Sequence, residues 1–92
     1  NGVLKMNELT YNTIMGVIYG AMWDYNFNVR LNNCTDELLS SRRAYINGLS
    51  TMAAAIGIKV IVAYENILTN SLITDITVNG TSVLDWKNGI NN

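Results

Sequence analysis

The residues that could do chemistry are few and scattered along this chain. Its 92 residues include no histidine, one cysteine and seven carboxylates. Cys34 stands directly before an expected helix start, where a thiolate would be stabilised, but a nucleophilic cysteine needs a base beside it. The carboxylates show neither a metal-binding spacing nor an Asp-rich loop. The sequence therefore predicts no catalytic residue, no metal site and no cofactor.

One catalytic alternative stays open, because two carboxylates that folding brings together are invisible in a sequence. Such a pair could serve as general acid and general base in a small hydrolase or isomerase. The candidates are Asp24, Asp36, Asp75 and Asp85, placed at a subunit interface. A folded pocket that holds two close carboxylates would favour this alternative.

Arg42 and Arg43 form the one concentration of positive charge. Arginine presents a planar fork of donors that suits carboxylates and phosphates. One interpretation is surface ion pairing, for instance with Glu37, Asp36 or Asp24. The other is contact with a protein partner or a small anionic ligand, together with an aromatic neighbour. Trp86, which precedes Lys87 at the end of an expected edge strand, is the best candidate for an exposed anchor, although core packing is the favoured interpretation of its role.

Residues 51–65 offer a second alternative, a nucleic-acid-associated regulator with a helix-turn-helix-like segment. Ala53, Gly57 and Ile58 have the spacing of a small residue, a turn glycine and an apolar residue. A recognition helix needs polar side chains aimed at base edges, and after the glycine only Lys59 is basic. A plain helix-turn-strand is therefore the favoured interpretation.

Composition limits the classes of protein to which the chain could belong. Hydrophobic residues make up 49% of the sequence and charged residues only 14%, which fits one small folded domain over residues 1–92 and favours oligomerisation. The net charge of −1 disfavours generic nucleic-acid binding. No apolar run reaches the roughly 18–20 residues of a membrane span. A single cysteine fits a reducing compartment such as the cytoplasm of a bacterial host.

The abundance of Asn and Ile, together with the absence of Pro and His, is typical of an AT-rich coding source such as a phage or mobile element. Residues 1–5 have two interpretations. They precede a natural start at Met6, or they follow a lost initiator before Asn1. Residues 88–92 are expected to be frayed.

A first helix is predicted from about residue 10 to residue 25. Its core-facing positions follow the helical repeat and are Ile14, Val17, Ile18, Ala21, Met22 and Tyr25. Met15, Tyr19 and Trp23 form a second apolar stripe, and Gly16 and Gly20 form a bare third one. Because one face suffices to cover the core, we expect these five residues at the interface of a homodimer or higher homo-oligomer.

A second helix is predicted over residues 36–56, after an extended loop over 26–34. Thr35 is a good N-cap, and Gly57 suits the position just after the helix. The expected core face consists of Leu38, Tyr45, Leu49, Met52 and Ile56, widened by Leu39, Ile46 and Ala53.

Three strands are predicted over residues 58–64, 72–78 and 81–86. The first is a β-branched run, and Asn79-Gly80 between the other two is a strong hairpin signal. A two-residue turn would pair Val78 with Thr81 and Ile76 with Val83. The predicted fold class is α+β, with two helices followed by a three-stranded, mostly antiparallel sheet.

These observations favour a small, non-enzymatic, homo-oligomeric binding or assembly protein. It would act stoichiometrically on a protein or a small anionic ligand.

Overall fold

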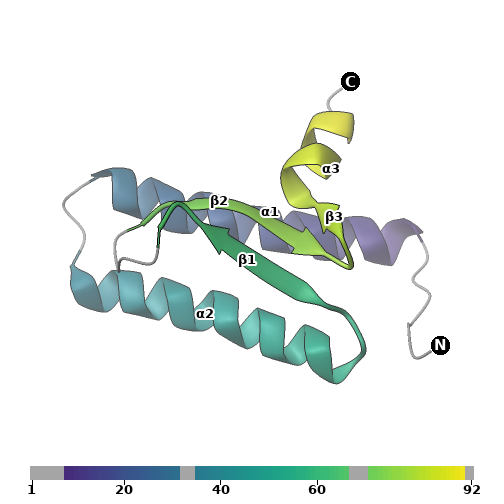
Figure 1. Cartoon of the computed structure of the whole chain (residues 1–92), viewed down its shortest axis with the longest axis horizontal. Helices are drawn as coiled ribbons and strands as arrows, with labels where there is room; N and C mark the ends of the chain where they lie inside the picture. The colour runs from purple at the N-terminus through teal and green to yellow at the C-terminus, as the bar shows by residue number, and fades with distance from the viewer. Residues whose placement is uncertain (1–7, 32–34, 67–70, 91–92) are drawn as a thin grey trace.

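The structure is a computed structural model that describes residues 8–31, 35–66 and 71–90. Two long helices, α1 (Glu8–Leu31) and α2 (Asp36–Ala55), run antiparallel to each other (Figure 1). A three-stranded antiparallel sheet follows, in the order β1 (Val60–Tyr64), β2 (Ile73–Val78) and β3 (Thr81–Ser82). A short helix, α3 (Val83–Ile90), packs against α1 and β2. The α+β class is confirmed, with one helix more than the sequence predicted.

Helix α1 is longer than predicted, because it continues through Leu31 where a loop over 26–34 was expected. Phe27, Val29 and Leu31 alternate as in a strand, yet they also continue helical spacings: Phe27 and Leu31 lie four and eight residues after Trp23. Asn26 does not end the helix, since its side chain is buried and hydrogen-bonded. The expectation of a loop was wrong here. Cys34 lies outside the described residues.

The caps predicted for α2 are confirmed. The Thr35 hydroxyl accepts a hydrogen bond from the backbone N–H of Leu38 at 3.1 Å. At the other end Gly57 has a φ of +84°, and the N–H of Ile58 donates to the carbonyl of Ala53 at 2.8 Å. This left-handed residue reverses the chain into β1. Because residues 60–64 form a strand, the 51–65 segment contains no recognition helix.

The hairpin at Asn79-Gly80 is confirmed. Both residues have positive φ, +50° and +86°, as a type I′ turn requires, and Val78 pairs with Thr81 as expected. The strand then ends at Ser82, so the expected strand over 81–86 and the pairing of Ile76 with Val83 were wrong.

Helix α3 begins where that strand was expected to continue, because Ser82 caps a helix. Its hydroxyl accepts a hydrogen bond from the N–H of Asp85 at 3.1 Å, and Asp85 adds a negative charge to the first turn. The pattern Ser82-x-x-Asp85 is a helix-start signal that the alternation of residues 81–86 obscured.

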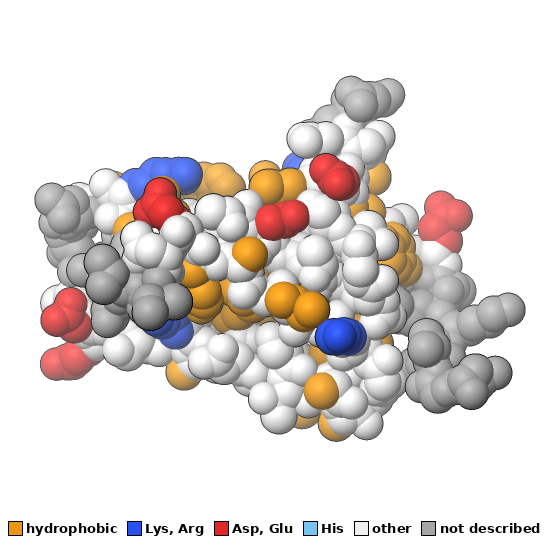
Figure 2. All heavy atoms as spheres, in the orientation of Figure 1, with side chains coloured by type: hydrophobic (Ala, Val, Ile, Leu, Met, Phe, Trp, Pro, Cys, Tyr) orange, Lys and Arg blue, Asp and Glu red, His pale blue; other side chains and the backbone are white. Residues whose placement is uncertain are grey.

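The core lies between the sheet and the helices. Side chains of β1 and β2 alternate, so that Ile76 and Val78 are fully buried while Ile61 is half exposed. Among the described residues, eleven hydrophobic side chains form the buried cluster: Met15, Ile18, Met22, Tyr25, Leu39, Ile46, Ile58, Ile73, Ile76, Val78 and Val83. On the outer face of the sheet, hydrophobic side chains lie in small groups separated by polar ones (Figure 2). None of the described helices is long and apolar enough to cross a membrane.

Candidate functional site

Both predicted arginines contact side chains of their own chain. Arg42 Nε lies 2.9 Å from Asp24 Oδ2 in an ion pair between α2 and α1, and both side chains are about two-fifths exposed (41% and 43%). This matches the surface ion pairing that the sequence offered as one interpretation of Arg42.

Arg43 lies between two aromatic rings at the same end of the helix pair. Its guanidinium carbon is 4.6 Å from the centre of the Tyr64 ring and 5.7 Å from that of Tyr25, and its Nε donates to the Tyr25 hydroxyl at 3.1 Å. Burial raises the pKa of the Tyr64 hydroxyl, although the Arg43 charge acts in the opposite direction. Arg43 thus has aromatic neighbours within its own chain, and the expected contact with a ligand or partner stays a prediction.

Buried polar contacts tie α1 to the start of β2 beside this cluster. The Asn26 amide donates to the Ile73 carbonyl at 2.9 Å and accepts from the Ile73 N–H at 2.8 Å. The Tyr25 hydroxyl donates to the carbonyl of Ser71 at 2.8 Å. These contacts were not predictable from the sequence, because the bonded residues are 46 and 47 positions apart.

Trp86 lies on α3 rather than on an edge strand, and it packs inward. Its indole N–H donates to Asn12 Oδ1 at 2.8 Å, and its ring reaches the surface of α1 beside Gly16, within 3.8 Å of where a Cβ would stand. The surface at Gly16 is therefore covered by α3 of the same chain, where a second copy was expected. Met15, which was expected to remain uncovered, is fully buried in the core.

Of the remaining residues of the predicted stripe, Tyr19 is partly covered by α3, whereas Trp23 is exposed. Tyr19 is half-buried, with Lys87 of α3 positioned 5.5 Å from its ring centre. Trp23 is 54% exposed and stacks on Phe27, with ring centres 5.1 Å apart. At Gly20 no atom lies within 4 Å of the point that a Cβ would occupy, so the space above this residue is open.

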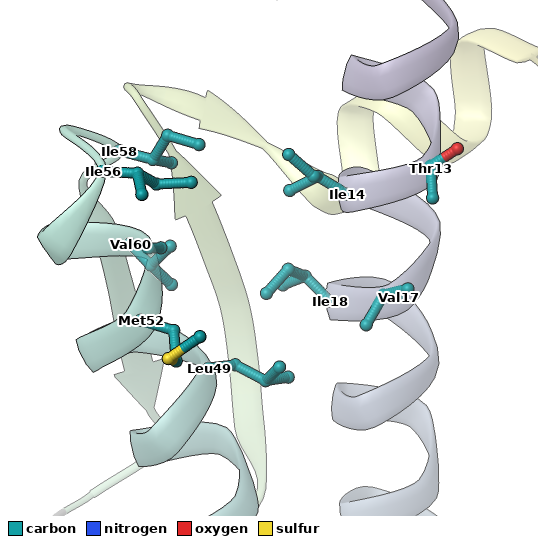
Figure 3. Close-up of a pocket in the computed structure, with 10 residues that line it drawn as sticks. Thr13, Ile14, Val17, Ile18, Leu49, Met52, Ile56, Ile58 and Val60 are labelled. Atoms are coloured by element: carbon teal, nitrogen blue, oxygen red, sulfur yellow. The ribbon is translucent and has the colours of Figure 1, made fainter. Parts of the chain in front are cut away.

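The largest departure from expectation is an apolar groove between α1 and α2 (Figure 3). Side chains of the two helices point toward each other across it, and Ile58 and Val60 contribute from the sheet side. The cavity volume is about 240 Å³, and among its described lining residues only Thr13 has a polar side chain.

The rim of this groove is built from side chains that the sequence assigned to the core. Val17 is 45%, Met52 73% and Ile56 56% exposed. The buried side of α2 is centred on Leu39 and Ile46 instead, so the expectation that Tyr45, Met52 and Ile56 face the core was wrong. The helical repeat located the apolar residues, but the spacing between the helices decides how many of them are covered.

A second hollow of about 340 Å³ lies between α1, α3 and the start of β2. Trp23 and Leu84 contribute apolar walls, while Arg30 and Glu65 add one charge of each sign. Neither hollow contains two carboxylates among its described lining residues. Across residues 8–31, 35–66 and 71–90, no three His, Cys, Asp or Glu side chains gather into a possible metal site.

No protein-family model matches this chain, and neither the curated proteins nor the solved structures include one significantly similar to it.

Proposed function

We propose that this protein is a non-enzymatic binding or assembly module that takes a protein surface into the groove between α1 and α2. The observation that carries the proposal is the apolar lining of a groove whose rim side chains Val17, Met52 and Ile56 face water. Exposed apolar patches with a concave shape are typical of protein interaction sites.

The contacts of the arginines favour a protein surface over a small anionic ligand. Arg42 faces Asp24, and Arg43 is held against Tyr25 and Tyr64. An anion that recruited Arg43 would have to displace it from its aromatic contacts, and a small anion at Arg42 would lie against the Asp24 carboxylate without bringing a positive charge to offset it. An apolar partner surface needs no such competition, because the groove lining is almost entirely aliphatic.

The positions of the carboxylates support a role without catalysis. Asp24 is paired with Arg42, and Asp75 Oδ1 accepts a hydrogen bond from the N–H of Ile76 at 2.8 Å. General acid–base catalysis would need two titratable groups that face one substrate. We expect a screen with phosphoesters, esters and glycosides to show no turnover. Turnover that disappears in an Asp24→Asn or Asp75→Asn variant would contradict the proposal.

The groove can be tested directly with a fluorescent anilinonaphthalene sulfonate dye at low protein concentration. An Ala53→Phe substitution places a ring in the groove, since Ala53 lines it. The matched control is Ala44→Phe, on α2 outside the groove lining. We expect dye binding to be lost in the first variant and kept in the second, with circular dichroism unchanged in both. Equal dye binding by the two variants would contradict a binding role for the groove.

A further inference from the structure

We propose that the partner taken up by the groove is a second copy of this chain, related by a two-fold axis that runs along the groove. This inference rests on the proposed function and names the partner for the same site. The axis would place α1 of each copy on α2 of the other, without displacement along the helices. The open grooves would then face each other.

The face that would be covered carries large apolar side chains along α2. Tyr45 and Met52 are separated by seven residues, which places them on one side of the helix, and they are 52% and 73% exposed. Val17 of α1 lines the same groove as Met52. A two-fold axis along the groove exchanges these positions, so that Val17 of one copy meets Met52 of the second copy. Each copy thereby covers exposed apolar side chains of the other.

The charges on this face are self-complementary under the same axis. Asp24 lies seven residues after Val17, on the same side of α1, and its carboxylate faces Arg42 across the helix pair at 2.9 Å. The two-fold operation places Asp24 of each copy over Arg42 of the second copy. Both side chains are partly exposed, so they can contact the second copy while keeping their contact within the chain. Acidic and basic groups thus meet at both symmetry-related positions.

Two glycines leave room for close approach on this face. Gly20 precedes Asp24 by one turn of α1, and Gly48 precedes Met52 by one turn of α2. No atom lies within 4 Å of a Cβ position at either residue, so neither glycine is required by packing against the described part of the chain. Glycine within a helix is unfavourable by about 1 kcal/mol relative to alanine. A second helix backbone passing over these positions gives both glycines a role.

The outer edge of β1 is the rival surface for a second copy. Its five residues, Val60–Tyr64, carry no charge, and exposed strand edges readily pair. However, α2 packs against β1 and lies along this side of the sheet (Figure 1). A two-fold pairing of β1 strands would bring α2 of both copies to the same place, which favours the helix face.

The decisive experiment reverses the charges in two separate chains. In the Asp24→Arg variant both charged contacts across the axis join two cations, and in the Arg42→Asp variant both join two anions. We expect each variant alone to dimerise about tenfold more weakly than the unmodified chain, and the equimolar mixture to form the heterodimer. Native mass spectrometry resolves the two homodimers and the heterodimer by mass.

The chain that carries both substitutions, Asp24→Arg with Arg42→Asp, is the control for folding. It restores the ion pair within the chain and across the axis, so it should dimerise like the unmodified protein. A mixture that associates no better than its components would overturn the inference, and so would a monomeric unmodified chain. In either case dye binding that still depends on Ala53 would leave the proposed function standing, whereas loss of both results would contradict the two proposals together.

Discussion

The two ends of the α1–α2 pair are held by different forces. At the end near Asp24 and Arg42, the ion pair, the Arg43–Tyr64 contact and the buried Asn26–Ile73 hydrogen bonds connect α1, α2 and the sheet. At the other end Val17, Met52 and Ile56 face an open groove with an aliphatic lining. Directional polar contacts fix the first end in one arrangement. Apolar contacts are not directional, so the second end can be completed by another surface.

The largest difference in the free energy of unfolding is expected between alanine substitutions at a buried methionine, Met15, and at an exposed one, Met52. Met15 is fully buried, so Met15→Ala leaves a cavity and should lower the free energy of unfolding by about 2–5 kcal/mol. Met52 is 73% exposed, and Met52→Ala should change this free energy by less than about 0.5 kcal/mol at low protein concentration. Urea denaturation of both variants measures the difference. Equal losses would mean that the groove is closed within one chain.

Removing the buried amide of Asn26 should lower the free energy of unfolding by about 2–3 kcal/mol. Asn26→Ala leaves the N–H and carbonyl of Ile73 without the hydrogen bonds that Asn26 provides, in a residue that is 3% exposed. The matched control is Asn47→Ala at an exposed position of α2, where the change should be near zero. Denaturation curves of the two variants give the comparison. A small change in the free energy of unfolding for Asn26→Ala would show that water takes over the hydrogen bonds to Ile73. It would contradict the view that polar contacts fix this end of the α1–α2 pair.

Adding a methyl group at Gly20 should have the smallest effect, and it should be favourable in the monomer. Because the space above Gly20 is open, Gly20→Ala should raise the free energy of unfolding by about 0.5–1 kcal/mol in dilute solution. At Gly80 the same change should lower it, since a φ of +86° is strained for alanine. Thermal denaturation at low concentration separates the two. A destabilised Gly20→Ala variant would show that this face is already occupied within the chain.

The parts of the fold that were predictable from the sequence depend on neighbouring residues. Thr35, Gly57 and Asn79-Gly80 each place a cap or a turn through their own backbone and side-chain chemistry, and all three are confirmed. The failure at residues 81–86 was also local, because Ser82 and Asp85 carry a helix-start signal that competes with the alternation. At residues 81–86 a strand-like alternation and a helix-start pattern overlap, and the structure has a helix whose first turn is capped by Ser82.

The candidate site was less predictable, because it depends on distances between elements. The helical repeat placed Val17, Met52 and Ile56 on the apolar faces of the two predicted helices. It could not show that these positions of α1 and α2 would line an open groove. Likewise, the sequence could not show that Met15 would be buried and that α3 would pack on Tyr19 while Trp23 stays exposed. The expectation of an interface on the first helix remains a prediction, now centred on Val17 and Gly20.

The dimer through the α1–α2 groove is best tested by sedimentation equilibrium of the unmodified chain over a wide range of concentrations, with Met52→Glu and Ile61→Glu measured beside it. Both substitutions place a carboxylate at an exposed apolar position, the first in the groove and the second on the outer face of the sheet. A dimer formed through the groove should give the mass of two chains for the unmodified protein and for Ile61→Glu, and a monomer for Met52→Glu. A mass of 10.2 kDa for the unmodified chain at every concentration, or a dimer that only Ile61→Glu disrupts, would contradict it.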